Sequence, residues 1–176
     1  MQYLRNTTKM PLPLRADGTN IVKWWVDVSY AVHPDMRSQT GGTMSLVKGA
    51  IISTSSKPKM TTKSSTETEL IATDNLMSHI LWKIISWIGK DTMPKAKFSI
   101  KTIRVHYWFE KNGKKSRSKR TKHIDIRYYF ITERVKADEL NIEYCPTGDM
   151  VVDYFTKPLQ GKKFYQFRKE ITNLKY

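Results

Sequence analysis

The sequence predicts one α/β domain in which a mixed five-stranded sheet is flanked by helices, and three observations support this class. The chain has 176 residues, which is the length of a single domain. Hydrophobic residues make up 39% and charged residues 27%, so the chain can build a core and is unlike a disordered protein. Segments with a period of two and segments with a helical period follow one another in the order β-β-β-α-β-α-β-α-α.

Three short strands open the predicted sheet. In residues 21–29, Val22, Trp24 and Val26 alternate with more polar neighbours, which is the period of a half-buried strand. Two more strands are expected at residues 43–48 and 50–54, on either side of Gly49. Because the connections are tight, these three strands are expected to form an antiparallel meander.

A long helix and a second group of elements follow. Ser64 with Glu67 and Thr66 with Glu69 both have the spacing of a capping box, and an apolar stripe at helical spacing follows them, so a helix is expected within residues 61–90. Strands are expected at about 98–107 and at 140–144, and a helix at 123–136. A short helix must end by Lys157, because Pro158 disfavours helical geometry in the residue before it, and a final helix closes the chain.

The charge of the chain indicates a polyanionic partner. The 31 Lys and Arg residues outnumber the 16 Asp and Glu residues, which gives a net charge of +15, and nucleic acid is the commonest partner of such a protein. Residues 111–122 hold seven basic residues and no acid, and they could contact phosphates without reading base sequence. The alternative is a solvated surface loop. The candidate nucleic-acid-binding residues are Lys114, Lys115, Arg117, Lys119, Arg120 and Lys122.

Several classes of protein are excluded. Cys145 is the only cysteine, so disulfide scaffolds and cysteine-rich zinc sites are ruled out, and the four scattered histidines argue against a histidine zinc site. The sequence has no apolar run of about 18 residues and no apolar signal-peptide segment, so neither a membrane span nor secretion is expected. We expect a protein of the cytoplasm or nucleus, with no membrane partner and no small-molecule cofactor.

Three carboxylates lie in apolar surroundings: Asp27 within a strand, Glu69 just before the apolar stripe of the long helix, and Asp153 between valines and aromatic residues. A carboxylate near the edge of a core needs a partner, and a divalent cation is one. Two such ions about 3.5–4 Å apart can activate water and stabilise the leaving oxygen in phosphodiester cleavage. The ordinary alternative is that Asp27 marks the end of a strand and that Glu69 and Asp153 stand near the starts of helices, where the helix dipole favours acids. From the spacing alone, this alternative is favoured for each residue taken singly.

Several sequence blocks, in order, resemble one protein family. Residues 64–72 read SSTETELIA and resemble the SSTEAEY helix start of ribonuclease H domains in Pol polyproteins of copia-type LTR retrotransposons. Residues 120–128 are similar to that family's RTKHIDIRYH block, and residues 152–159 to its ADIFTKPL block. Shorter stretches also resemble blocks of the family: residues 3–7 resemble its YLRGT, residues 26–30 its DASY and residues 34–42 its DPDDRRSTSG. The resemblance therefore covers nearly the whole chain.

The resemblance implies a fold, an activity and a set of site residues. It implies an RNase H-like fold that cleaves the RNA strand of an RNA–DNA hybrid with two Mg²⁺ or Mn²⁺ ions, beside the reverse transcriptase domain of the same polyprotein. Carried over by position, Asp27, Glu69 and Asp153 are the catalytic metal ligands, and we expect them to converge in one pocket. The chain would then divide into the tail of the connection region of the reverse transcriptase (1–20), the RNase H-like domain (21–159) and a C-terminal helical extension (160–176).

One expected carboxylate is missing. The family has a fourth acid at the end of its fourth strand, where an ungapped alignment places Thr102. A hydroxyl cannot replace an anionic bridging ligand, so hydrolysis is expected to be weakened or lost. Two hypotheses remain: an impaired ribonuclease H, and a retroelement relic that only binds nucleic acid.

The segment around Thr102 can be explained by a change of reading frame. Codons for residues 100–108, with a codon for Ser99 before them, can be chosen so that another frame of the same DNA reads YKDNTSALL, which resembles the family's motif and contains its aspartate. We therefore interpret this segment as a compensated frameshift, in the element or in its sequencing.

Overall fold

The computed structural model describes residues 5, 7–15, 21–45, 48–58, 61–88, 97–102 and 122–174. The elements and their bounds, in chain order, are β1 (Ile21–Ser29), β2 (Gln39–Ser45), β3 (Ile52–Ser56), α2 (Ser65–Ile88), β4 (Lys97–Thr102), α4 (Lys122–Lys136), β5 (Asn141–Tyr144), η1 (Thr147–Asp149), α5 (Asp153–Thr156) and α6 (Gly161–Thr172). This order agrees with the order expected from the sequence, with one added 3-10 turn, η1.

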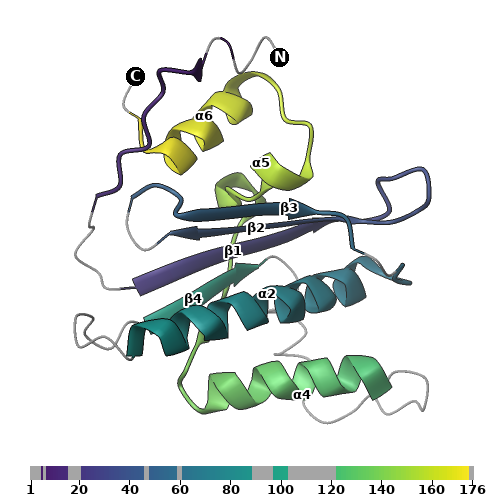
Figure 1. Cartoon of the computed structure of the whole chain (residues 1–176). Coiled ribbons are helices and arrows are strands. Elements are labelled where there is room, and N and C mark those ends of the chain that lie inside the picture. Colours follow the sequence, from purple (N-terminus) through teal and green to yellow (C-terminus); the bar gives the residue numbers. More distant parts are fainter. Residues whose placement is uncertain are drawn as a thin grey trace.

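The described strands form one mixed sheet with the order β3-β2-β1-β4-β5. β1 pairs antiparallel with β2, and β2 with β3, whereas β4 runs parallel to both β1 and β5. The prediction of a mixed five-stranded sheet that opens with an antiparallel meander is confirmed for the described residues. Figure 1 shows α2 and α4 on one side of this sheet and α5 and α6 on the other.

The start of α2 is capped by Ser64 and Glu67, one of the two pairs that the sequence indicates. The Ser64 hydroxyl accepts a hydrogen bond from the backbone N–H of Glu67 (3.2 Å), and the Glu67 carboxylate accepts one from the backbone N–H of Lys63 (3.0 Å). Side-chain acceptors of this kind satisfy N–H groups that have no partner within the helix. Glu67 is therefore engaged at the helix end, and Glu69, two residues later, is buried.

The core lies between the sheet and α2. Trp24 and Val26 of β1 and Ile100 of β4 pack with Met77 and Ile80 of α2, and all five side chains are buried. Full burial of each large apolar side chain contributes about 1.5–3 kcal/mol to stability. α4 packs on α2, where Arg127 and Asp74 form an ion pair of 3.2 Å.

Strand β2 begins earlier than the sequence predicts and contains two glycines that were expected to precede it. A Cβ atom on Gly41 would lie 2.6 Å from Thr156 Cγ2 of α5, and one on Gly42 would lie 2.7 Å from Leu76 Cδ1 of α2. Because neighbouring residues of a strand point to opposite faces, this pair lets one helix approach each side of β2. Glycine has low strand propensity, so the sequence pattern alone did not indicate a strand there.

Residues at both ends of the described chain pack together. Phe167 of α6 is fully buried, and the backbone carbonyl of Ile171 accepts a hydrogen bond from the N–H of Ala50 (2.8 Å). The side-chain amide of Asn173 donates to the carbonyl of Pro13 (2.7 Å). In Figure 1 the purple N-terminal segment accordingly runs beside α6. None of the helices in the described ranges is long and apolar enough to cross a membrane.

Candidate carboxylate site

Asp27 lies near the C-terminal end of β1. In the described part of the sheet, the pairing of β1 with β4 runs from Ile21 to Trp25, and Asp27 is paired with Gly41 of β2. Asp27 is 3% exposed, and its Oδ2 accepts a hydrogen bond from the Thr156 hydroxyl of α5 (2.7 Å). Gly41 leaves the space in which α5 comes this close to the carboxylate.

Asp153, the first residue of α5, meets Asp27 through a shared lysine. Its side chain is 1% exposed, and its Oδ1 lies 2.6 Å from Lys157 Nζ. The same Nζ lies 3.5 Å from Asp27 Oδ2, so one ammonium group joins the two carboxylates. A second lysine, Lys163 of α6, places its Nζ 3.3 Å from the other oxygen of Asp153.

The packing around α5 positions Asp153. Met150 and Val152, which precede the helix, are buried with Cys145, and Trp25 and Phe155 pack against this cluster. The Ser55 hydroxyl of β3 donates to the backbone carbonyl of Phe155 (2.6 Å). A helix of four residues has little stability of its own, so these tertiary contacts hold it in place.

The electrostatics of this pair reflect burial and the shared ammonium. Burial raises the pKa of Asp27 above its ordinary value, against the opposing effects of the Thr156 hydrogen bond and the Lys157 charge. Burial lowers the pKa of Lys157, but its hydrogen bond to Asp153 and the charge of Asp27 outweigh this effect, so its pKa is raised overall. The two carboxylates therefore favour a cation between them.

Glu69 lies on the other side of the sheet from α5. Its side chain is 5% exposed, and its Oε2 accepts a hydrogen bond from the hydroxyl of Thr102 (3.2 Å). Thr102 is the C-terminal residue of β4 and is buried. The position at which the resemblance expects a fourth carboxylate is thus occupied by a hydroxyl that contacts Glu69.

The described residues bring two of the three expected ligands together. Asp27 and Asp153 offer adjacent carboxylate oxygens, which are the ligands that Mg²⁺ and Mn²⁺ prefer, so their chemistry fits a divalent ion. Glu69 instead contacts Thr102. Across the described ranges the structure contains no group of three or more His, Cys, Asp or Glu side chains arranged to hold a metal ion.

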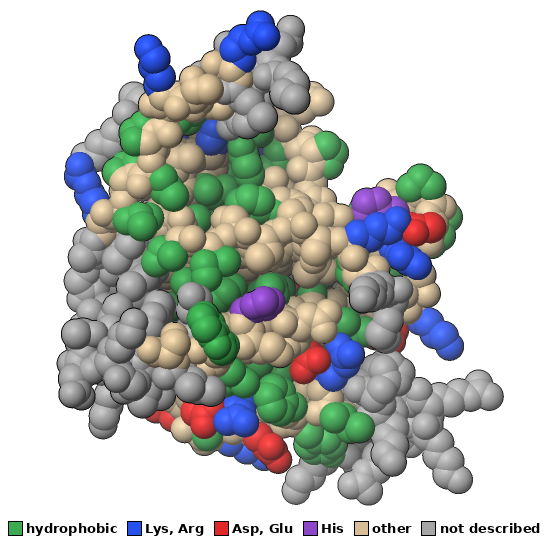
Figure 2. Space-filling view, in the orientation of Figure 1, with side chains coloured by type: hydrophobic (Ala, Val, Ile, Leu, Met, Phe, Trp, Pro, Cys, Tyr) green, Lys and Arg blue, Asp and Glu red, His purple; other side chains and the backbone are tan. Residues whose placement is uncertain are grey.

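The predicted basic contacts fall mostly outside the described residues. Residues 103–121, which hold the candidates Lys114, Lys115, Arg117, Lys119 and Arg120 and most of the frameshift segment, are not described, and Lys122 is the first residue of α4. On the face shown in Figure 2 the described Lys and Arg side chains are scattered and form no single stripe.

Sequence reasoning missed Thr156, Lys157 and Lys163. The spacing of Asp153 and Lys157, four residues apart in a short helix, is the spacing at which side chains meet, and it could have indicated that pair. The contacts of Asp27 with Thr156 and Lys157 join residues from opposite ends of the chain, and no local pattern signals them.

The chain is similar over its whole length to segments of transposon polyproteins. It is 28% identical over 177 residues to the "Retrovirus-related Pol polyprotein from transposon TNT 1-94" of Nicotiana tabacum, a match that covers 99% of this chain and 13% of the relative. It is 26% identical over 178 residues to the Pol polyprotein from transposon RE2 of Arabidopsis thaliana, covering 99% of this chain and 12% of the relative. The chain thus spans about an eighth of the length of these relatives, and their similarity confirms the resemblance found in its motifs.

The fold is similar to a solved ribonuclease H structure. The crystal structure of LC11-RNase H1 in complex with RNA/DNA hybrid matches with a TM-score of 0.53 and 10% sequence identity, over 76% of this chain and 92% of that one. This likeness confirms the RNase H-like fold. No model of a known protein family matches the chain.

Proposed function

We propose that this chain, which has an RNase H-like fold and is similar throughout to plant transposon Pol polyproteins, hydrolyses the RNA strand of RNA–DNA hybrids. The observation that carries the proposal is the meeting of two buried carboxylates, Asp27 and Asp153, at the end of β1. Two buried carboxylates in contact need a cation, and a divalent ion at such a site is suited to phosphodiester chemistry.

The chain's own residues would hold the metal and tune it. Asp27 and Asp153 would ligate a Mg²⁺ or Mn²⁺ ion, which when bound activates water and stabilises the leaving oxygen, and the family resemblance expects two ions. The Thr156 hydroxyl, 2.7 Å from Asp27, orients that carboxylate by donating to one of its oxygens. Glu69 is proposed as the third ligand.

The charge of the chain supports a nucleic acid partner. A net charge of +15 favours binding to a polyanion, and the run at residues 111–122 is proposed to contact the phosphates. The solved ribonuclease H that matches this fold was crystallised with an RNA/DNA hybrid. Because the relatives are Pol polyproteins, the reverse transcriptase domain of such a polyprotein is the proposed neighbour.

One observation favours a second candidate function. Thr102 lies where the family resemblance predicts an acidic residue. Its hydroxyl donates a hydrogen bond to the Glu69 carboxylate. A site that lacks one anionic ligand binds divalent ions more weakly. A chain that binds hybrids through its basic residues without cleaving them is therefore the second candidate.

The two candidates are separated by a cleavage assay and a binding assay on the same protein. We expect a labelled RNA–DNA hybrid to be cut slowly in Mg²⁺ or Mn²⁺, at least about 100-fold faster by the wild type than by Asp27→Asn, because the substitution removes the ligand charge. We expect Thr102→Asp to raise the rate. If wild type and Asp27→Asn cut equally, while fluorescence anisotropy still detects hybrid binding, the second candidate is correct.

A further inference from the structure

The ammonium group of Lys157 occupies the place where two buried carboxylates meet. Its Nζ lies 2.6 Å from Asp153 Oδ1 and 3.5 Å from Asp27 Oδ2. Lys163 lies 3.3 Å from the other Asp153 oxygen and also donates to the carbonyl of Thr147 (3.2 Å). Of these two lysines, only Lys157 contacts both acids in the structure.

An ammonium group in this position performs the electrostatic task of a metal ion. Removing one partner of a buried ion pair is strongly destabilising, because the other charge is left without compensation. Lys157 supplies that compensation to Asp27 and Asp153 together.

A divalent ion and the Lys157 ammonium cannot hold these oxygens at the same time. Mg²⁺ binds carboxylate oxygens at about 2.0–2.1 Å, and it requires the Asp153 oxygen that the ammonium now contacts at 2.6 Å. Two cations that share one oxygen at such distances would also repel each other. Binding of the ion therefore requires that the lysine leave.

The structure provides space for that movement. Lys157 lines a cavity of about 300 Å³ together with Tyr154, Pro158, Leu159 and Phe164. Its side chain is 36% exposed, whereas both carboxylates are almost completely buried. The lysine has a long flexible stem, so it can move while the acids and the backbone of α5 stay in place.

We propose that Lys157 is an internal cation that holds Asp27 and Asp153 together in the metal-free protein and that a divalent ion must displace it. This rests on the proposed function only in assigning a divalent ion to the two carboxylates. Lys157 is a positioning residue in this scheme: it keeps the ligands assembled and raises the concentration of ion that the site needs.

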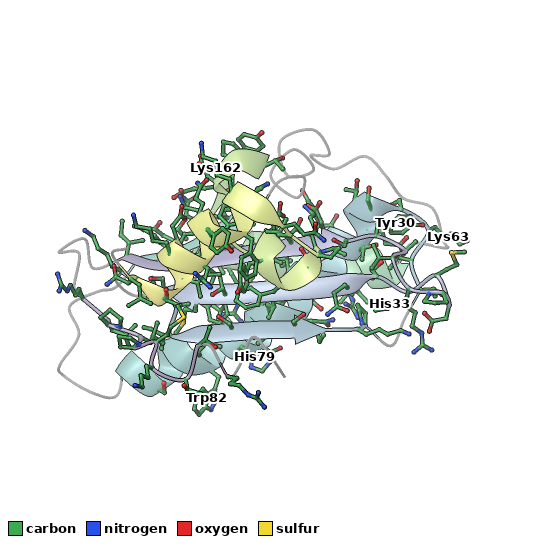
Figure 3. The ribbon with its side chains drawn as sticks, turned by 90° about the horizontal axis from the view of Figure 1, so that it is seen from above. Tyr30, His33, Lys63, His79, Trp82 and Lys162 are labelled. Carbon is green, nitrogen blue, oxygen red and sulfur yellow. The ribbon has the colours of Figure 1, made fainter. Side chains whose placement is uncertain are left out.

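The test compares Lys157→Met with Lys163→Met and Lys162→Met, each of which removes one positive charge. Lys162 is exposed at the start of α6, and Figure 3 labels it at the periphery of the molecule. In EDTA we expect Lys157→Met to lower the Tm by about 5 °C and Lys162→Met to leave it within about 1 °C of wild type. By calorimetric titration with MnCl₂, we expect Lys157→Met to bind Mn²⁺ about tenfold more tightly than wild type. In the wild type the ammonium occupies the site for most of the time and competes with the ion, and the variant lacks this competitor.

The control variants make each result decisive. The proposal is overturned if Lys157→Met has the Tm and the Mn²⁺ affinity of wild type, or if it binds no Mn²⁺. Equal tightening in Lys157→Met and Lys163→Met would also overturn it, because that result would reflect only the lost charge. Lys157→Arg, which keeps a cation, is expected to retain the wild-type Tm. None of these measurements uses hybrid cleavage, so a chain that binds Mn²⁺ as expected but cuts nothing would overturn the proposed function alone.

Discussion

At the scale of single residues, the three buried carboxylates of the described chain, Asp27, Glu69 and Asp153, each have an identifiable partner. Asp27 accepts a hydrogen bond from the Thr156 hydroxyl, and Glu69 accepts one from the Thr102 hydroxyl. Asp153 forms an ion pair with Lys157. A buried polar group without a partner is destabilising by about 1–3 kcal/mol, and more if it is charged. The contact between Thr102 and Glu69 therefore stabilises the fold.

Cys145 gives a prediction about pH at this scale. It is a free, buried cysteine, and burial raises the pKa of its thiol above the ordinary value of 9.0. Above pH 9 the unfolded chain loses this proton before the folded chain does, so the folded state binds more protons and its stability falls as the pH rises. We expect the urea midpoint of the wild type to fall between pH 8.5 and 10.5 by more than that of Cys145→Ala.

The same variant serves as the control for other alkaline effects. Lys157 also has a raised pKa, and its contribution to stability is lost as the pH rises through that pKa in both proteins. The difference between the two curves therefore isolates Cys145. Parallel curves for wild type and Cys145→Ala would contradict the prediction.

At the scale of elements, the site depends on the position of one very short helix. α5 carries Asp153 at its first residue and Thr156 at its last, and Lys157 follows directly. Its place is set by the hydrogen bond from Ser55 and by the close approach to Gly41. Directly after β1, the Tyr30 hydroxyl donates a hydrogen bond to the carbonyl of Thr62 (3.1 Å), and Figure 3 shows Tyr30 and Lys63 at the same end of the molecule.

Substitution of Gly41 tests the role of this packing. In Gly41→Ala the new methyl group would lie 2.6 Å from Thr156 Cγ2, closer than real contacts allow, so the Thr156 side chain or α5 itself must move. We expect the variant to lose about 1–3 kcal/mol of unfolding free energy, measured by urea titration, and to bind Mn²⁺ more weakly.

Gly148→Ala is the matched control for this substitution. A Cβ at Gly148 meets nothing within 4 Å, so the same chemical change is made without a clash. We expect its urea midpoint and its Mn²⁺ affinity to stay close to those of wild type. If Gly41→Ala behaves like Gly148→Ala, α5 does not depend on this approach.

At the scale of the whole molecule, the two ends of the described chain complete one face of the structure. The Asn173 side-chain amide donates a hydrogen bond to the Pro13 carbonyl, and the Ile171 carbonyl accepts one from the backbone N–H of Ala50. The Phe167 side chain is fully buried. A cavity of about 540 Å³ lies beside these contacts, with Trp25 and Val151 among its lining residues. We propose that α6 belongs to the folded unit, although the sequence division assigns residues 160–176 to an extension.

Substitutions in α6 test this proposal. Phe167→Ala is expected to cost about 3–5 kcal/mol of unfolding free energy, because it leaves a cavity at a fully buried position. Tyr165→Ala, in the same helix but 59% exposed, is expected to cost less than about 1 kcal/mol. Similar small losses in both variants, measured by urea titration, would mean that α6 is an extension that contributes little to the fold.

The sequence by itself determined the order of the elements and the family resemblance, and it placed the bounds of β1, α4 and β5 to within one residue, whereas β2 and β3 lie 2–4 residues from their expected starts. The period of two in β1 and the capping of α2 by Ser64 are local features, and each acts within a few residues of the chain. The roles of Asp27, Glu69 and Asp153 in metal binding stay predictions, as do the contacts of the basic run.

Only the tertiary structure decided which groups meet. Asp27 and Lys157 come together, Thr102 donates to Glu69, and Gly41 makes room for α5 because the fold brings distant segments together. These contacts depend on how the strands pair and on which face of the sheet each helix covers, and no periodicity within one segment encodes that arrangement.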